Sequence, residues 1–250
     1  MVLITGASSG IGEACARIFA VDPRTRGLIL VARRKERLDK LAQELARKRD
    51  FEVRVFELDV RKRRQIESWA KKESELLGKV SVLVNNAGLA AGFAPIQEGK
   101  LDDWDATIDT NVKGLLYVTH AVLPHFIEKN EGHIVNLGSV AGYEVYPKGN
   151  IYCASKHAVK AITESLRVDL LGTKIRVSSV SPGMVETEFS RVRMGDQRKA
   201  DAVYAGMTPL TASDIAECIH WCVRRPKHVN IQDMIIYPTD QAKPTLVARK

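Results

Sequence analysis

Tyr152 and Lys156 are the pair of side chains whose types and spacing most directly suggest chemistry. The surrounding sequence has helical periodicity, and residues four apart on a helix lie on the same face, so the two side chains can approach each other. A free phenol has a pKa of about 10, which is too high for a base near neutral pH. Lowering it to about 7 requires roughly 4 kcal/mol, which an ammonium about 4 Å away supplies at an effective dielectric constant of about 20. The pair is therefore suited to proton transfer, although the same spacing also occurs on ordinary helix faces.

Ser139 and Asn111 could complete a site around this pair. Ser139 follows residues 133–137, which we expect to form a strand, and parallel sheets bind their ligands at the carboxyl ends of strands. Its hydroxyl could donate to a substrate oxygen and hold that oxygen against the Tyr152 hydroxyl. Asn111 lies in a long helical stretch, where asparagine is mildly unfavourable, and it could hold a water that links Lys156 to solvent. We therefore predict Asn111, Ser139, Tyr152 and Lys156 as the catalytic residues.

A glycine-rich turn near the start of the chain is typical of a phosphate-binding loop. The segment TGASSGIG, Thr5–Gly12, follows a short apolar run and leads directly into a helical pattern. Gly6 permits a tight turn, Gly10 lets backbone N–H groups approach a pyrophosphate, and Gly12 allows the helix to pack closely on the sheet. The strand before the loop and the helix after it favour a dinucleotide site over an ordinary turn.

The residues after the second predicted strand indicate which dinucleotide binds. NAD sites of this design usually have Asp or Glu about 20 residues after the glycine-rich loop, bonded to the ribose 2′-hydroxyl. This sequence has Arg33 and Arg34 there instead, two guanidinium groups able to bind a 2′-phosphate. Ser8 and Ser9 could add hydroxyl donors. We therefore predict NADP(H) as the cofactor; the alternative is that the two arginines only begin a surface helix.

Strand-like and helical segments alternate along the whole chain, which is typical of a parallel sheet covered on both faces. This alternation predicts an α/β fold of the Rossmann type: a doubly wound parallel seven-stranded sheet with helices on both faces, in a single domain spanning residues 1–250. The polar segment 187–208 is expected to be a mobile lid over the substrate or an irregular insertion, and the tail 238–250 to be extended or poorly ordered. Strands are expected at 2–5, 27–32, 53–58, 80–85, 133–137, 175–180 and 234–237, and helices at 11–20, 35–48, 61–77, within 101–129, at 150–171 and at 211–224.

Composition and charge narrow the class of protein. The chain has no apolar run long enough to cross a bilayer and no secretory signal, so we expect a cytoplasmic protein with no membrane partner. Its four cysteines are too few for a disulfide framework and are expected to be reduced. Cys218 and Cys222 could share a helix face with a metal, but no second ligand pair is visible, so no metal is expected. The net charge of +8 is spread over helices that also carry acidic residues, so we expect solvated helix faces and no nucleic-acid partner.

Taken in order, the motifs resemble those of the short-chain dehydrogenase/reductase family over nearly the whole chain. The resemblance implies hydride transfer between nicotinamide and a carbonyl or alcohol, a strand order of 3-2-1-4-5-6-7, and a homotetramer. It also implies adenine contacts for Asp59 and Val60, a nicotinamide-ribose contact for Lys156, and carboxamide contacts for Val185 and Thr187. The matching pieces are TGASSGIG at 5–12, Asp59 in LDV, NNAG at 85–88, Asn111, Ser139, Tyr152 with Lys156, and Pro182-Gly183 with Thr187. The predicted cofactor-binding residues are Gly6, Ser8, Ser9, Gly10, Ile11, Gly12, Arg33, Arg34, Asp59, Val60, Asn85, Ala87, Tyr152, Lys156, Pro182, Gly183, Val185 and Thr187.

Segments 85–92, 108–119, 182–193 and 228–241 are similar to one branch of this family, the NADP-dependent 3-hydroxy acid dehydrogenases that oxidise serine and allo-threonine. The resemblance implies a small acid with a β-hydroxyl as the substrate. Its carboxylate needs a cationic partner, for which Arg191 and Arg193 of the predicted lid are the candidates, with Ser139 and Tyr152 at the reacting oxygen. Surface charge in a loop is the alternative for these two arginines. Two other functions stay open: an NADPH-dependent reductase of a bulkier ketone, such as a pterin-like or 3-oxoacyl substrate, and a non-catalytic NADP-binding regulator.

Overall fold

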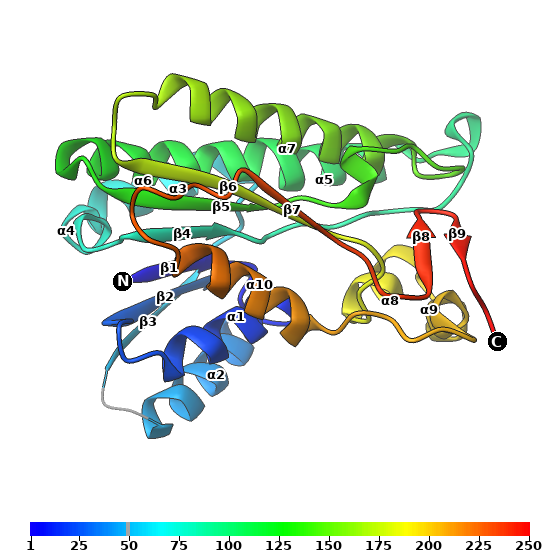
Figure 1. Ribbon diagram of the computed structural model, residues 1–250, viewed down its shortest axis with the longest axis horizontal. Helices are drawn as coiled ribbons and strands as arrows, with labels where there is room; N and C mark the ends of the chain where they lie inside the picture. Colours follow the sequence, from blue (N-terminus) through cyan, green and yellow to red (C-terminus); the bar gives the residue numbers. More distant parts are fainter. Residues whose placement is uncertain (49–50) are drawn as a thin grey trace.

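A parallel sheet organises the computed structural model, which describes residues 1–48 and 51–250 (Figure 1). Its seven strands lie in the order β3-β2-β1-β4-β5-β6-β7, and each neighbouring pair is parallel. The predicted fold class and strand order are therefore confirmed. Strand order reverses between β1 and β4, so the carboxyl ends of these strands open the crevice in which such sheets bind ligands. The strands are β1 Val2–Thr5, β2 Gly27–Ala32, β3 Glu52–Glu57, β4 Val82–Asn85, β5 Gly132–Leu137, β6 Ile175–Pro182 and β7 Asp233–Ile236.

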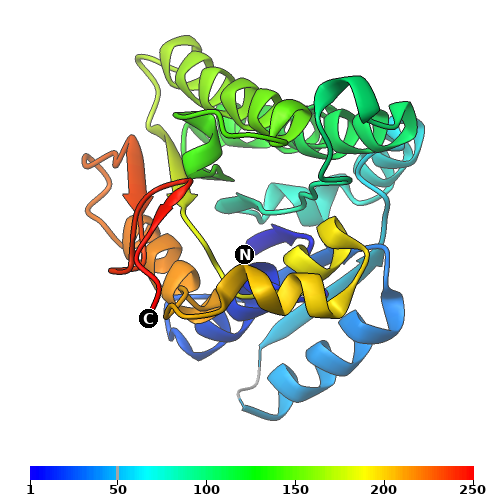
Figure 2. The same ribbon diagram turned by 90° about the vertical axis from the view of Figure 1, so that its right-hand side faces the viewer.

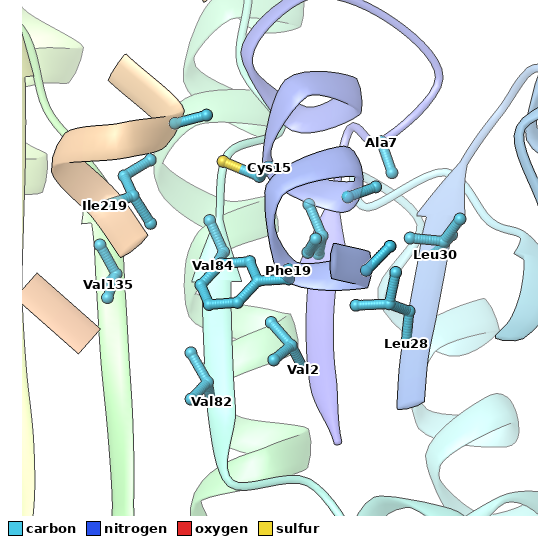
Figure 3. Packing of buried hydrophobic residues seen from close by; sticks show 14 of the residues in the cluster. Val2, Ala7, Cys15, Phe19, Leu28, Leu30, Val82, Val84, Val135 and Ile219 are labelled. Atoms are coloured by element: carbon cyan, nitrogen blue, oxygen red, sulfur yellow. The ribbon is translucent and has the colours of Figure 1, made fainter. Parts of the chain in front are cut away.

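Helices cover both faces of this sheet (Figure 1). Phe19 and Ile219 pack with Val84 and Val135 of the central strands in one buried cluster (Figure 3), and Phe126 belongs to a second cluster on the other face. Strands β1, β2 and β4 are buried along their whole length, which explains why their sequences are continuous apolar runs rather than alternating ones. The first layer contains α1 Gly10–Val21, α2 Lys35–Lys48 and α10 Ala212–Val223; the second contains α3 Arg63–Lys72, α4 Ser74–Gly78, α5 Leu101–Ile108, α6 Leu115–Lys129 and α7 Asn150–Asp169.

Two helical stretches differ from the predictions. The helix expected at 61–77 begins two residues later, because the Asp59 carboxylate accepts the backbone N–H of Arg61 in a turn, and it divides into α3 and α4. The stretch that joins α5 to α6 is a π-helical turn, η2 (Asp109–Gly114). Turns of this kind recur at functional sites, and this one contains Asn111.

The segment predicted as a lid or an irregular insertion is helical. It forms α8 (Glu188–Met194) and α9 (Gln197–Tyr204), which face the viewer in Figure 2. The Thr187 hydroxyl accepts the backbone N–H of Phe189, so the first turn of α8 has the side-chain cap that a polar residue before a helix provides.

The C-terminal tail, expected to be extended or poorly ordered, forms an antiparallel hairpin of β8 (Gln241–Lys243) and β9 (Leu246–Val247) beside these helices (Figure 1). The Arg249 guanidinium donates to the carbonyl oxygen of Val203, and the backbone N–H of Lys250 donates to that of Gly206. The two residues at the end of the chain are therefore tied to the end of α9 and the turn after it by one side-chain and one backbone hydrogen bond.

Over residues 1–48 and 51–250, no helix is long and apolar enough to cross a membrane. The same part of the chain contains no group of three or more His, Cys, Asp and Glu side chains that could hold a metal ion. The ring of His220, which lies between Cys218 and Cys222 in sequence, is instead hydrogen-bonded to the Asp22 carboxylate at 2.6 Å. All four cysteines are free thiols.

Candidate active site

A cavity of about 900 Å³ runs along the carboxyl ends of β1, β2, β4, β5 and β6, where α8 and the C-terminal hairpin complete its wall. It brings together most of the residues that the sequence predicted, although they come from segments far apart in the chain. The predicted residues that line it are Gly6, Ser8, Ser9, Gly10, Ile11, Arg33, Arg34, Asp59, Val60, Ala87, Ser139, Tyr152, Lys156, Pro182, Gly183, Val185, Thr187 and Arg193. Four predicted residues do not line it: Gly12, Asn85, Asn111 and Arg191.

The glycine-rich loop has the backbone geometry that its sequence requires. Gly6 and Gly10 have φ angles of +66° and +56°, in the left-handed region that favours glycine. A Cβ atom on Gly12 would lie 2.5 Å from the carbonyl oxygen of Gly6, so only glycine lets α1 start this close to the loop. Gly12 thus lies behind the cavity wall and has the packing position expected for it.

Asn86 lines the cavity, and Asn85, which was predicted there, does not. Asn85, expected in the cofactor groove, is buried and donates to Thr119 and Asn136, each at 2.9 Å. Asn86 lines the cavity instead, and its side-chain amide donates to the Thr5 carbonyl at 2.9 Å. Successive side chains point to opposite sides at a strand end, so the neighbouring residue takes the groove position.

The two arginines after β2 have different surroundings. The Arg34 guanidinium donates to the hydroxyls of Ser8 at 3.2 Å and Ser9 at 2.6 Å, and its Nη1 donates to Glu188 at 2.9 Å. Arg33 lines the cavity, and within the described chain its side chain has no hydrogen bond or ion pair. Its charge contributes to lowering the pKa of Asp59. A guanidinium whose N–H groups are not used by the protein at the end of β2 fits a dinucleotide that carries a 2′-phosphate.

Ser139 and Tyr152 meet at the centre of the cavity. Both line the cavity, Ser139 is among the groups that lower the pKa of the Tyr152 phenol, and the Ser139 hydroxyl accepts the backbone N–H of Ala141 at 3.1 Å. Burial, and to a smaller extent Tyr146, raises the pKa of the Tyr152 phenol above its usual value, while the bond to Ser139 and the charge of Arg193 act in the opposite direction. A phenol whose pKa lies above the usual value of about 10 stays protonated near neutral pH, and this is the form that can donate a proton to a carbonyl oxygen.

Lys156 lies beside Tyr152 on the same helix. Its Nζ lies 5.9 Å from the centre of the Tyr152 ring and donates to the Leu137 carbonyl at 2.7 Å. Burial lowers the pKa of Lys156 to about 8. The effect of Lys156 on the pKa of Tyr152 stays a prediction.

Asn111 lies just outside the cavity, within the π-helical turn. Its side-chain oxygen accepts the Leu89 N–H at 2.8 Å, and its amide donates to the Leu89 carbonyl at 2.8 Å and to the Ser155 hydroxyl at 3.0 Å. The side chain thus links the loop after β4 to α7, the helix of Tyr152 and Lys156. The water link between Asn111 and Lys156 remains a prediction.

Arg193 has the surroundings expected of an anion-binding residue, whereas Arg191 does not. The Nη1 of Arg193 donates to the Tyr146 hydroxyl at 2.9 Å, and its guanidinium lies 4.8 Å from the Phe93 ring centre and 5.3 Å from that of Tyr152. Its Nε and Nη2 are buried and have no hydrogen-bond partner among residues 1–48 and 51–250. Arg191 does not line the cavity, is about half exposed, and contacts Glu188 at 3.4 Å.

Sequence reasoning missed Phe93, Tyr146 and Asn86, which line the cavity. It also missed that the C-terminal segment lines the cavity, through Gln241 and Arg249. An asparagine beside the predicted Asn85 was a usable signal for Asn86. The two aromatic residues lie in irregular loops, where no periodicity indicates the direction of a side chain.

The site combines a dinucleotide groove with a serine, a tyrosine and a buried lysine. This combination is that of a nicotinamide-dependent oxidoreductase. Residues 1–198 match the short chain dehydrogenase family, and the chain belongs to this family. It is 50% identical to sulfoacetaldehyde reductase 2 of Chromohalobacter salexigens over 97% of this chain and 95% of that protein. It is 44% identical to the NADP-dependent 3-hydroxy acid dehydrogenase YdfG of Salmonella typhimurium over 97% of this chain and 96% of that protein. Among solved structures, the closed form of a serine dehydrogenase complexed with NADP⁺ matches with a TM-score of 0.89 and 41% identity, covering 100% of this chain and 99% of that one.

Proposed function

We propose that this chain is an NADP-dependent oxidoreductase that transfers a hydride between nicotinamide and a small 3-hydroxy acid, such as serine or allo-threonine, or a sulfonate of the same length. The observation that carries the proposal is that one edge of the Arg193 guanidinium is buried and unpaired. Its Nε and Nη2 are buried without a partner, and its guanidinium lies 5.3 Å from the Tyr152 ring centre. Two unpaired N–H groups on one edge of a guanidinium match the two oxygens of an acid group.

The substrates in the names of these relatives share one spacing between the reacting carbon and the acid group. Sulfoacetaldehyde, and the aldehydes that correspond to 3-hydroxy acids, each have one carbon between the reacting carbon and the acid group. An acid group held by Arg193 would therefore place the reacting oxygen of either class near Tyr152 and Ser139. Carboxylate and sulfonate differ in shape, planar against tetrahedral, and this difference is what the substrate test has to resolve.

The residues of the groove are assigned to NADP(H) in this proposal. Arg33 would hold the 2′-phosphate, and the loop that contains Gly6 and Gly10 would hold the pyrophosphate. Lys156 would contact the nicotinamide ribose, as the family resemblance implies. The remaining assignments are Ser8, Ser9, Ile11, Arg34, Asp59, Val60, Asn86, Ala87, Pro182, Gly183, Val185 and Thr187, all of which line the cavity. When bound, the nicotinamide supplies or accepts the hydride.

The proposed proton transfer uses Tyr152. In reduction its phenol donates a proton to the carbonyl oxygen as the carbon receives the hydride, and in oxidation the proton returns to Tyr152. Ser139 donates a hydrogen bond to the same oxygen and keeps it within reach of the phenol. Arg193 holds the acid group at the other end of the molecule, so that the reacting carbon cannot rotate away.

Initial rates with NADP⁺ and NAD⁺ test this proposal. We expect turnover of serine, allo-threonine, 3-hydroxypropionate or isethionate, with a clear preference for NADP⁺, and slow turnover of uncharged alcohols of the same length. Comparison of 3-hydroxypropionate with isethionate separates a carboxylate enzyme from a sulfonate enzyme. Faster oxidation of bulky uncharged alcohols than of all four acids would overturn the proposal, as would the absence of turnover.

We further propose a homotetramer, as the family resemblance implies. Large apolar side chains are exposed on α6, α7, α10 and β7, among them Ile127, Val168, Trp221 and Ile235. Exposed apolar side chains of this kind mark association surfaces when they lie together. Light scattering coupled to size-exclusion chromatography would give a mass about four times that of the 27.7 kDa chain, and a monomer would contradict the proposal.

A further inference from the structure

Glu188, the first residue of α8, bridges the lid to the cofactor side of the molecule. Its carboxylate accepts hydrogen bonds from Arg34 Nη1 at 2.9 Å and from Arg37 Nη1 at 2.9 Å. Arg34 and Arg37 lie 154 and 151 residues away from it in the sequence. The two ion pairs hold the pKa of Glu188 down to about 2, so the carboxylate stays charged over the whole working range of pH.

Arg34 extends this contact to the glycine-rich loop. Its Nε and Nη2 donate to the hydroxyls of Ser8 and Ser9, while its Nη1 is used by Glu188. A Cβ atom on Gly10 would lie 3.5 Å from Thr187, which shows that the start of α8 packs directly on this loop. Polar contacts therefore run continuously from the phosphate-binding loop through Arg34 into the lid.

The far end of the same helix carries the substrate contact. α8 has seven residues, a length of about 10 Å, and Arg193 is near its C-terminal end. Phe189, the residue after Glu188, lies with its ring centre 5.5 Å from that of Tyr152. A helix this short moves as a unit, so whatever holds its first residue also sets the position of Arg193.

We propose that Glu188 is a positioning residue that, with Arg34 and Arg37, forms an ionic clasp holding α8 over the bound dinucleotide. The clasp retains the cofactor and places Arg193 for the substrate. The statement about Arg193 rests on the proposed function, whereas the statement about cofactor retention does not. Arg37 provides the sharpest test because, unlike Arg34, it does not line the cavity, and within residues 1–48 and 51–250 its side chain is hydrogen-bonded to Glu188 alone.

Release of NADPH from the enzyme alone tests the clasp. NADPH bound to Glu188→Gln and to Arg37→Gln would be displaced by excess NADP⁺ in a stopped-flow fluorimeter. We expect release about fivefold faster in Arg37→Gln, the size that about 1 kcal/mol of exposed ion pairing corresponds to, and at least as fast in Glu188→Gln, which also loses the pair with Arg34. Because Glu188→Gln already removes the Arg37 pair, the double variant should release NADPH no faster than Glu188→Gln alone. Added salt should speed release by the wild type and bring the rates together.

Glu186→Gln is the matched control. Glu186 is exposed, lies two residues before Glu188, and does not line the cavity; within residues 1–48 and 51–250 it forms no ion pair. Its release rate should equal that of the wild type. Thermal melting of all variants checks that they fold, and an unchanged release rate in Arg37→Gln with normal melting would overturn the clasp.

Substrate kinetics give a second, separate readout. In both clasp variants KM for the acid substrate should rise several-fold, while the rate of hydride transfer in a single turnover at saturation stays the same. A general structural defect would also slow hydride transfer at saturation. Because NADPH release is measured without substrate, failure of the clasp and failure of the proposed substrate class are distinguished by which of the two assays fails.

Discussion

Replacement of Arg193 by methionine separates anion recognition from packing. Methionine keeps an unbranched apolar chain between Phe93 and Tyr152 but removes the charge and the two unpartnered donors, Nε and Nη2. A hydrogen bond to a charged group contributes about 1.5–3 kcal/mol. Two such bonds in a cavity that is open to solvent at one end suggest a loss of about 3 kcal/mol, which is about 10²-fold in kcat/KM.

The assay compares 3-hydroxypropionate with its methyl ester. The two have the same reacting carbon and nearly the same length, but only the acid carries a charge. We expect Arg193→Met to lower kcat/KM about 10²-fold for the acid and less than about fivefold for the ester. Arg193→Lys should fall between the wild type and Arg193→Met for the acid, since a lysine keeps the charge and loses the two-pronged geometry. Equal losses on acid and ester would refute the reasoning and would leave Arg193 as packing for Tyr152.

Three further outcomes follow from the site and its surroundings. Tyr152→Phe should lower kcat by about 10³-fold, within the range of general acid–base catalysis, and leave NADPH affinity in a fluorescence titration unchanged; retained turnover would contradict its role. Gly12→Ala should lower the melting temperature by about 5 °C and weaken NADPH binding, because the new Cβ would lie 2.5 Å from the Gly6 carbonyl, and normal melting would show that the loop can yield. Burial raises the pKa of Asp233 from 3.8 to about 6, so folding favours its protonated form and stability falls as pH rises between these values. Asp233→Asn should therefore stabilise the protein at pH 8, by about 1 kcal/mol after allowance for a half-buried group, and not near pH 4, as urea unfolding at the two values would show.

The sequence by itself was sufficient for the features that local patterns specify. β1 and β2 lie within the predicted bounds, because a strand buried on both faces is a continuous apolar run between turn residues. The glycine-rich loop was predictable from Gly6, Gly10 and Gly12, since steric limits on the backbone act residue by residue. Tyr152 and Lys156 were found because a helix fixes the relation between residues four apart.

Tertiary structure alone decided which neighbouring side chain faces the cavity. Arg191 and Arg193 are two residues apart on α8, about 200° around a helix, so only one can face inward, and the packing of α8 selects Arg193. Asn86 rather than Asn85 enters the groove for the equivalent reason at the end of a strand.

Two properties of the site also depended on contacts between distant segments. The pKa of Tyr152 is shifted chiefly by burial, and three of the side chains that act on it, Tyr146, Ser139 and Arg193, lie outside its own helix. Glu188 meets Arg34 across 154 residues of chain, a contact that no local pattern encodes. Periodicity and steric limits act over a few residues and can be read along the chain, whereas burial and long-range pairing exist only after the whole chain has packed.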